Sequence, residues 1–119
     1  MDILLYDKTA VITGAARGIG RAIAAAMHAA GAQVVIADID LPAARQTAAE
    51  LGTRALALHV DTASVESCRQ LVADTIAQAG QLDILVNNAA ICPIHPIETV
   101  EPDLFDRMIA INLRGPYFL

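Results

Sequence analysis

Three glycines near the start of the chain have the spacing of a phosphate-binding turn. Gly14, Gly18 and Gly20 lie in the segment TGAARGIG of residues 13–20, between an apolar run and an Ala-rich run. Gly14 permits a sharp turn, Gly18 lets the backbone approach a pyrophosphate, and Gly20 lets the next helix pack closely. The helix N-terminus would add free N–H groups and a partial positive charge. The pattern favours binding of a dinucleotide, although a purely structural turn could carry the same glycines.

Asp38 stands where such a site needs a hydrogen-bond acceptor. It ends the second apolar run after the glycines, a position from which a carboxylate can accept hydrogen bonds from an adenosine ribose. A carboxylate there would also repel the 2′-phosphate of NADP, so the sequence predicts NAD as the cofactor. Arg17 leaves an alternative open, because a guanidinium in the glycine turn could reach a phosphate or could simply face solvent.

The elements that must position these residues alternate between strand and helix. Apolar runs rich in β-branched residues predict buried parallel strands, and Ala-rich runs of helical period predict the crossover helices. Strands are predicted at Thr9–Thr13, Gln33–Ala37, Ala55–Val60 and Ile84–Val86. Helices are predicted at about Gly18–Ala30, Leu41–Leu51 and Ser64–Ala79, and a last helix begins near Glu101 and continues through Arg107–Leu119.

The expected fold class is α/β, a Rossmann-type doubly wound parallel sheet that is incomplete because its later strands are missing. Right-handed crossovers order the strands 3-2-1-4, with the ligand crevice at their C-terminal ends between the first and fourth strands. No linker or repeat divides the chain, so we predict one NAD-binding domain over residues 1–119. Because the last residues, Tyr117 to Leu119, are apolar and uncapped, we expect a domain truncated at this end.

Four motifs together resemble the short-chain dehydrogenase/reductase family, and they span nearly the whole chain. TGAARGIG resembles the family's TGxxxGIG signature, and Asp61 resembles its Asp that bonds the adenine amino group. NNAA at residues 87–90 resembles its NNAG motif, and Asn112 resembles the Asn whose helix distortion holds a water of the proton relay. The resemblance implies a catalytic role for Asn112. The expected cofactor-binding residues are Gly14, Arg17, Gly18, Ile19, Gly20, Asp38, Ile39, Asp61, Thr62, Asn87, Ala89 and Ala90.

The chain departs from the family pattern at one motif position, where Ala90 replaces a glycine. A positive φ there would cost about 1 kcal/mol or more. The family's reaction, hydride transfer between an alcohol and a ketone, implies a Ser, a Tyr and a Lys after the fifth and sixth strands. The chain has only Tyr6 and Tyr117, neither of which opens a YxxxK motif, and its sole lysine, Lys8, precedes the first strand. We therefore expect residues 1–119 alone to be inactive.

Composition narrows the class of partner. A net charge of -5 gives no electrostatic basis for binding nucleic acid. The first seven residues lack the features of a signal peptide and no stretch is long and apolar enough for a bilayer, so we expect a cytoplasmic location and no membrane partner. Cys68 and Cys92 form no CxxC pair, and the three histidines form no ligand set, so no metal site is expected. His95 could line a substrate entrance.

Two functions stay open at this point. One is an NAD-dependent oxidoreductase of a secondary alcohol, with a weak similarity in motif wording to polyol dehydrogenases and 3-oxoacyl reductases. The other is a non-catalytic NAD-binding module or partner subunit. The resemblance also implies a homo-oligomer, a dimer or tetramer, in which the helix carrying Asn112 packs against its symmetry mate. Leu104, Phe105, Met108 and Ile109 could form that interface or belong to the core.

Overall fold

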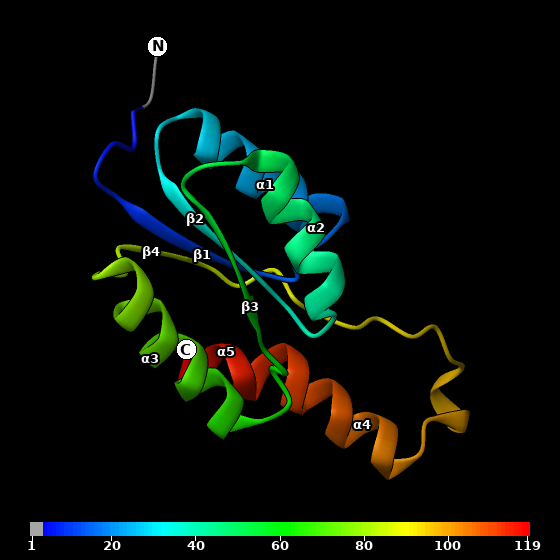
Figure 1. The fold of residues 1–119 in the computed structure, drawn as a ribbon. Coiled ribbons are helices and arrows are strands. Elements are labelled where there is room, and N and C mark those ends of the chain that lie inside the picture. Colours follow the sequence, from blue (N-terminus) through cyan, green and yellow to red (C-terminus); the bar gives the residue numbers. More distant parts are fainter. Residues whose placement is uncertain (1–3) are drawn as a thin grey trace.

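A parallel sheet with two helical layers forms the molecule (Figure 1). The computed structural model describes residues 4–119, so residues 1–3, where the predicted domain and the segment tested for a signal peptide begin, lie outside the described residues. The strands are β1 (Thr9–Thr13), β2 (Gln33–Asp38), β3 (Ala55–His59) and β4 (Ile84–Val86). Their order is β3-β2-β1-β4 with every pairing parallel, which confirms the predicted fold class and strand order.

Helices cover both faces of this sheet. The helices are α1 (Gly18–Ala29), α2 (Leu41–Leu51), α3 (Val65–Ala79), α4 (Pro102–Ile109) and α5 (Gly115–Phe118). Figure 1 shows α1 and α2 on one face and α3 with α5 on the other. Because successive side chains of a strand point to opposite faces, Ile12 and Ile36 pack in the core under α1 and α2, whereas Val11 and Val35 pack in the core under α3. This burial on both faces explains the continuous apolar runs of β1 and β2.

The ends of several elements differ from the prediction by a residue or two. β2 continues through Asp38, whereas β3 ends at His59 and leaves Val60 outside the strand. Ser64 lies just before α3 and accepts a hydrogen bond from the N–H of Ser67, which makes it the N-cap of that helix. Differences of this size are ordinary where a terminal turn or strand end frays.

The last helix predicted from near Glu101 is present from Pro102 to Phe118, but it is not a regular α-helix throughout. The structure has α4, then a π-helical turn at Ala110–Arg114, then α5, and a short 3₁₀ turn at Ile97–Thr99 precedes them. A π-helical turn inserts an extra residue into the helix, and such turns occur often at functional sites. Its presence around Asn112 agrees with the helix distortion that the family resemblance implied.

The side chains left undecided between core and interface divide into two groups. Phe105 and Ile109 of α4 are exposed, and Leu104 and Met108 are partly buried.

Cys68 belongs to α3 and is buried in the core between that helix and the sheet. This burial raises the pKa of its thiol. Within residues 4–119, no helix combines the length and the apolar character needed to cross a membrane.

Candidate functional site

The glycine turn joins the end of β1 to the start of α1. Gly14 and Gly18 have φ values of +66° and +64°, in the left-handed region that glycine adopts without strain. Gly20 is needed for space, because a methyl group at its Cα would lie 2.5 Å from Asn88 Nδ2 and would also meet the carbonyl of Gly14. Two of the three physical roles predicted from the spacing, a tight turn at Gly14 and close packing at Gly20, therefore match the geometry.

The N-terminus of α1 differs from those of α2 and α3. Asp40 caps α2 by accepting a hydrogen bond from the N–H of Ala43, and Ser64 caps α3 in the same way. At α1 the N-cap residue Arg17 makes no such bond, and the first turn holds no acidic side chain. The free N–H groups and the positive end of the helix dipole thus lie open next to the exposed Gly18 and Ile19. This end of α1 can accept an anionic ligand such as a phosphate.

Asp38 holds its carboxylate beside the same turn. The residue is 8% exposed at the carboxyl end of β2. Its Oδ2 accepts a hydrogen bond of 3.1 Å from the N–H of Ala16, and its Oδ1 accepts one of 3.0 Å from the N–H of Asp40. These backbone bonds fix both oxygens, so the negative charge of Asp38 stands at a defined place next to the glycine turn.

The side chain of Arg17 pairs with Asp40. Its guanidinium forms an ion pair of 2.8 Å with the carboxylate of Asp40, and both side chains are largely exposed. The hydrogen bond from Arg17, together with the N–H of Ala43, holds the pKa of Asp40 below its ordinary value. The same pairing raises the pKa of Arg17. Arg17 is therefore directed to the start of α2, and an exposed pair of this kind contributes little to stability.

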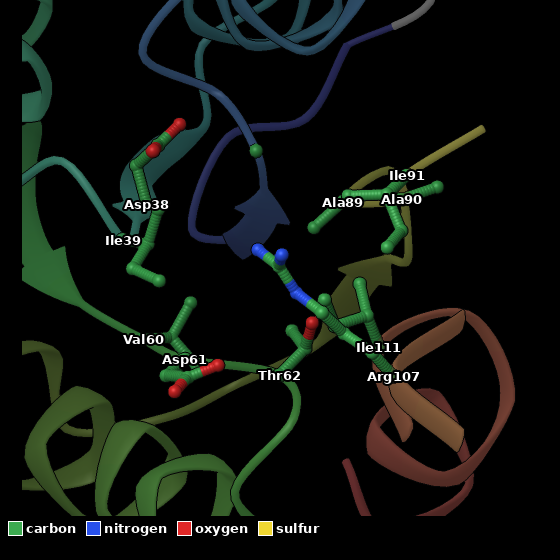
Figure 2. Close-up of a pocket in the computed structure, with 11 residues that line it drawn as sticks. Asp38, Ile39, Val60, Asp61, Thr62, Ala89, Ala90, Ile91, Arg107 and Ile111 are labelled. Carbon is green, nitrogen blue, oxygen red and sulfur yellow. The ribbon is translucent and has the colours of Figure 1, made fainter. Parts of the chain in front are cut away.

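A pocket of about 240 Å³ opens at the carboxyl ends of the strands (Figure 2). Its walls come from the segments that follow all four strands and from the helical segment after residue 101, so it extends beyond the predicted crevice between the first and fourth strands. The lining residues are Gly14, Asp38, Ile39, Val60, Asp61, Thr62, Ala89, Ala90, Ile91, Arg107 and Ile111. Such a position, outside the carboxyl ends of parallel strands, is where open α/β sheets bind ligands.

The pocket brings together seven of the residues expected to bind a cofactor. They are Gly14, Asp38, Ile39, Asp61, Thr62, Ala89 and Ala90. The others lie outside its lining: Gly18 and Ile19 are at the open end of α1, Gly20 is buried behind the turn, Arg17 is paired with Asp40, and Asn87 is exposed after β4. Asp61 accepts a hydrogen bond of 3.0 Å from the N–H of Ala63, which orients its carboxylate.

Asn88, which the sequence reading did not single out, supports the glycine turn. Its side-chain Nδ2 donates to the carbonyl oxygens of Thr13 at 3.0 Å and Gly14 at 3.2 Å. The hydroxyl of Thr13 in return accepts from the N–H groups of Asn88 and Ala89, at 3.1 and 3.0 Å. The pair of asparagines in NNAA was the only signal in the sequence, and it did not show which one makes these bonds.

Ala90 fits its place without strain. Among residues 4–119, the non-glycine residues with positive φ are Asp7 and Arg54. Ala90 therefore has an ordinary backbone conformation, and the energetic cost considered for an alanine in place of the motif's glycine does not arise.

Asn112 lies in the π-helical turn and holds the loop after β4. Its Oδ1 accepts a hydrogen bond of 2.9 Å from the N–H of Ile91, and its Nδ2 donates one of 2.7 Å to the carbonyl of the same residue. Gly115, in the next helical turn, packs against the backbone of Thr62, because a methyl group on Gly115 would collide with the carbonyl of Thr62. Asn112 and Gly115 thus hold the segments at 89–91 and 61–62 against the same helical segment. The side chain of Asn112 is not itself part of the pocket lining.

Arg107 lines the pocket itself and was also missed by the sequence analysis. It lies in the last turn of α4, and Figure 2 shows its side chain extending into the middle of the pocket, between Asp61 and Thr62 on one side and Ala89 on the other. A single arginine on an amphipathic helix carries no motif, so the sequence held no signal for this role.

The groups considered for proton transfer or metal binding do not belong to this pocket. Tyr6 and Lys8 line a separate hollow at the amino ends of the strands, and Tyr117 is 81% exposed on α5. His95 lies exposed in the loop before α4 and is not among the pocket's lining residues. In the part of the chain that the structure describes, no group of His, Cys, Asp and Glu side chains is arranged to hold a metal ion.

Comparison with known proteins finds a matching family model and similar dehydrogenases. A family model described as short chain dehydrogenase matches residues 8–119. The chain is 49% identical over 115 residues to sorbitol dehydrogenase of Cereibacter sphaeroides, covering 97% of this chain and 45% of that protein. It is 44% identical over 115 residues to galactitol 2-dehydrogenase of Agrobacterium fabrum, with 97% and 45% covered. The chain thus spans less than half the length of these curated relatives.

Solved structures share the fold closely. A short-chain dehydrogenase/reductase described as glucose/ribitol dehydrogenase, from Brucella melitensis, superposes with a TM-score of 0.95 at 36% identity, covering 100% of this chain and 51% of that one. A 3-ketoacyl-(acyl-carrier-protein) reductase from the same organism, complexed with NADH, has a TM-score of 0.90 at 37% identity, with 96% and 47% covered. A blue fluorescent protein from a metagenomic library, complexed with NADPH, has the same TM-score and identity, with 96% and 49% covered.

Proposed function

The chain belongs to the short-chain dehydrogenase family of oxidoreductases, and we propose that residues 1–119 form the NAD-binding part of an enzyme that interconverts a secondary alcohol and a ketone. The observation that carries this proposal is the uncapped N-terminus of α1 beside the fixed carboxylate of Asp38. The helix end offers N–H donors for the cofactor's phosphates, and Asp38 offers acceptors for the adenosine ribose. When bound, the nicotinamide would supply hydride transfer.

Most of the expected cofactor contacts have a distinct role in this proposal. Gly14, Gly18, Ile19 and Gly20 shape the phosphate site, Asp61 and Thr62 receive the adenine, and Ile39 offers an exposed apolar surface to the adenosine. Ala89 and Ala90 form the wall after β4, and Asn112 positions that wall through Ile91. Asn112 is in this sense a positioning residue, and we keep its place in a proton relay as part of the proposal.

The preference for NAD over NADP rests on local charge. The carboxylate of Asp38 is held with both oxygens in place, so a 2′-phosphate bound near it would meet a fixed negative charge. Arg17, the cation in the glycine turn, is already paired with Asp40. The solved relatives bind NADH in one case and NADPH in another, which makes a direct comparison of the two cofactors the decisive measurement.

The proposed substrate class is a secondary alcohol of the polyol type. Two curated relatives are named as dehydrogenases of sorbitol and galactitol, and each matches the chain over 97% of its length. We further propose that the Ser, Tyr and Lys of the reaction lie outside residues 1–119, because the tyrosines and the lysine present here do not line the pocket.

Three measurements test this function. The purified full-length protein should reduce NAD⁺ in the presence of sorbitol or galactitol and prefer NAD⁺ to NADP⁺ by at least about tenfold in kcat/KM. Asp38→Ser should reduce that preference, because it removes the charge that opposes the 2′-phosphate. A polypeptide of residues 1–119 should give no alcohol-dependent change in NADH absorbance. Cofactor binding by the full-length protein without any turnover would instead support a non-catalytic nucleotide-binding module.

A further inference from the structure

The pocket contains one basic side chain in the described part of the chain, and it comes from an unexpected element. Arg107 is the sole arginine or lysine among the lining residues, and it reaches the pocket from α4. Figure 2 shows Asp38, Ile39 and Asp61 at one end of the pocket and Ala89 to Ile91 at the other, with the Arg107 side chain between them. Arg107 thus occupies the middle of the pocket.

The charges around this guanidinium favour binding of an anion. The pocket lining includes two carboxylates, of Asp38 and Asp61, and a pocket with only these charges would repel any ligand that carries phosphates. Arg107 offsets one of them. Its guanidinium forms no ion pair with either carboxylate or with any other acidic group among residues 4–119, so its donors stay available to a ligand. In contrast, the guanidinium of Arg17 is already engaged by Asp40 at 2.8 Å.

The position of Arg107 in the pocket indicates which group of the ligand its guanidinium would contact. In the proposed function, on which this inference rests, Asp38 and Asp61 receive the adenosine end, and the segment at 89–91 forms the opposite wall of the pocket. In a dinucleotide the pyrophosphate is the anionic group attached to the adenosine, and Arg107 is the basic side chain that lines the pocket beside these carboxylates. A guanidinium placed there can donate two parallel hydrogen bonds to phosphate oxygens.

We propose that Arg107 binds the pyrophosphate of the dinucleotide, in addition to the N–H groups at the start of α1. The cofactor's negative charge is then met from two elements that are far apart in the sequence, the helix end at residues 18–20 and the last turn of α4. Because Arg107 is exposed and outside the two core clusters, replacing it should leave the fold intact.

The test compares a phosphate-bearing probe with a neutral one. Binding of ADP, adenosine and NADH to the purified protein is measured by calorimetry for the wild type and for Arg107→Met, Arg107→Lys and Arg45→Met. Arg45 is exposed on α2 and away from the pocket, so its variant controls for the change in net charge. Circular dichroism verifies that each variant is folded.

The inference predicts a selective loss of affinity. Arg107→Met should weaken binding of ADP and NADH by about 10–100-fold, the range for one charged hydrogen bond, and leave adenosine unchanged. Arg107→Lys should retain part of the affinity, and Arg45→Met should match the wild type. Equal losses for ADP and adenosine would overturn the inference in favour of stacking on the base, and unchanged ADP binding would overturn it outright. A wild type that binds neither ADP nor NADH would contradict the proposed function itself.

Discussion

Replacing Asn88 with alanine should destabilise the protein far more than the same change at its neighbour Asn87. The Asn88 side chain donates two hydrogen bonds, to the carbonyls of Thr13 and Gly14 at 3.0 and 3.2 Å, and it is partly buried. Each such bond contributes about 0.5–1.5 kcal/mol net, so Asn88→Ala should lower the free energy of unfolding by roughly 1–3 kcal/mol. Asn87 is exposed, and its replacement should change the free energy of unfolding by less than about 0.5 kcal/mol.

Urea unfolding followed by circular dichroism measures both variants on the same footing, with the slope against denaturant as a check that the transition is unchanged. Asn88→Asp is a second probe, because it places a carboxylate against the same two carbonyl oxygens and should destabilise at least as much as alanine. NADH affinity should fall in the Asn88 variants, since the glycine turn loses its support. Equal unfolding free energies for the two alanine variants would refute the assignment of this role to Asn88.

Three further predictions concern contacts around the pocket. Arg17→Met should raise the pKa of Asp40 toward its ordinary value, as measured by NMR titration of the carboxyl carbon, and an unchanged titration would contradict the pairing. Any contribution of the ion pair to the free energy of unfolding is present at neutral pH and is lost as the pH falls through the lowered pKa of Asp40. Gly115→Ala should destabilise by about 1–3 kcal/mol in thermal unfolding, because the added methyl group meets the carbonyl of Thr62; a variant as stable as the wild type would show that the helix can move away. Asn112→Ala should speed hydrogen exchange of the Ile91 amide in the loop after β4, while amides of β1 keep their protection. Unchanged exchange at Ile91 would show that Asn112 does not hold this loop in place.

Features that depend on residues close together in the chain could be predicted from the sequence. The glycine spacing of residues 13–20, the apolar runs of the strands and the acidic end of β2 each reflect a local rule of backbone conformation or side-chain alternation. With the preference for right-handed crossovers, these rules also gave the strand order and the edge of the sheet where the pocket lies.

Choices between equivalent local patterns could be made only by the tertiary structure. Asn87 and Asn88 are alike in sequence, and the alternation of side chains after β4 directs Asn88 to Thr13, 75 residues away. Arg17 meets Asp40 across 23 residues because β2 brings the start of α2 beside the glycine turn. Arg107 enters the pocket because of where α4 packs, and no local motif records that packing. The sequence thus determined the glycine turn, the strands and the edge of the sheet where the pocket lies, and the packing of distant segments decided which side chains support that turn and which line the pocket.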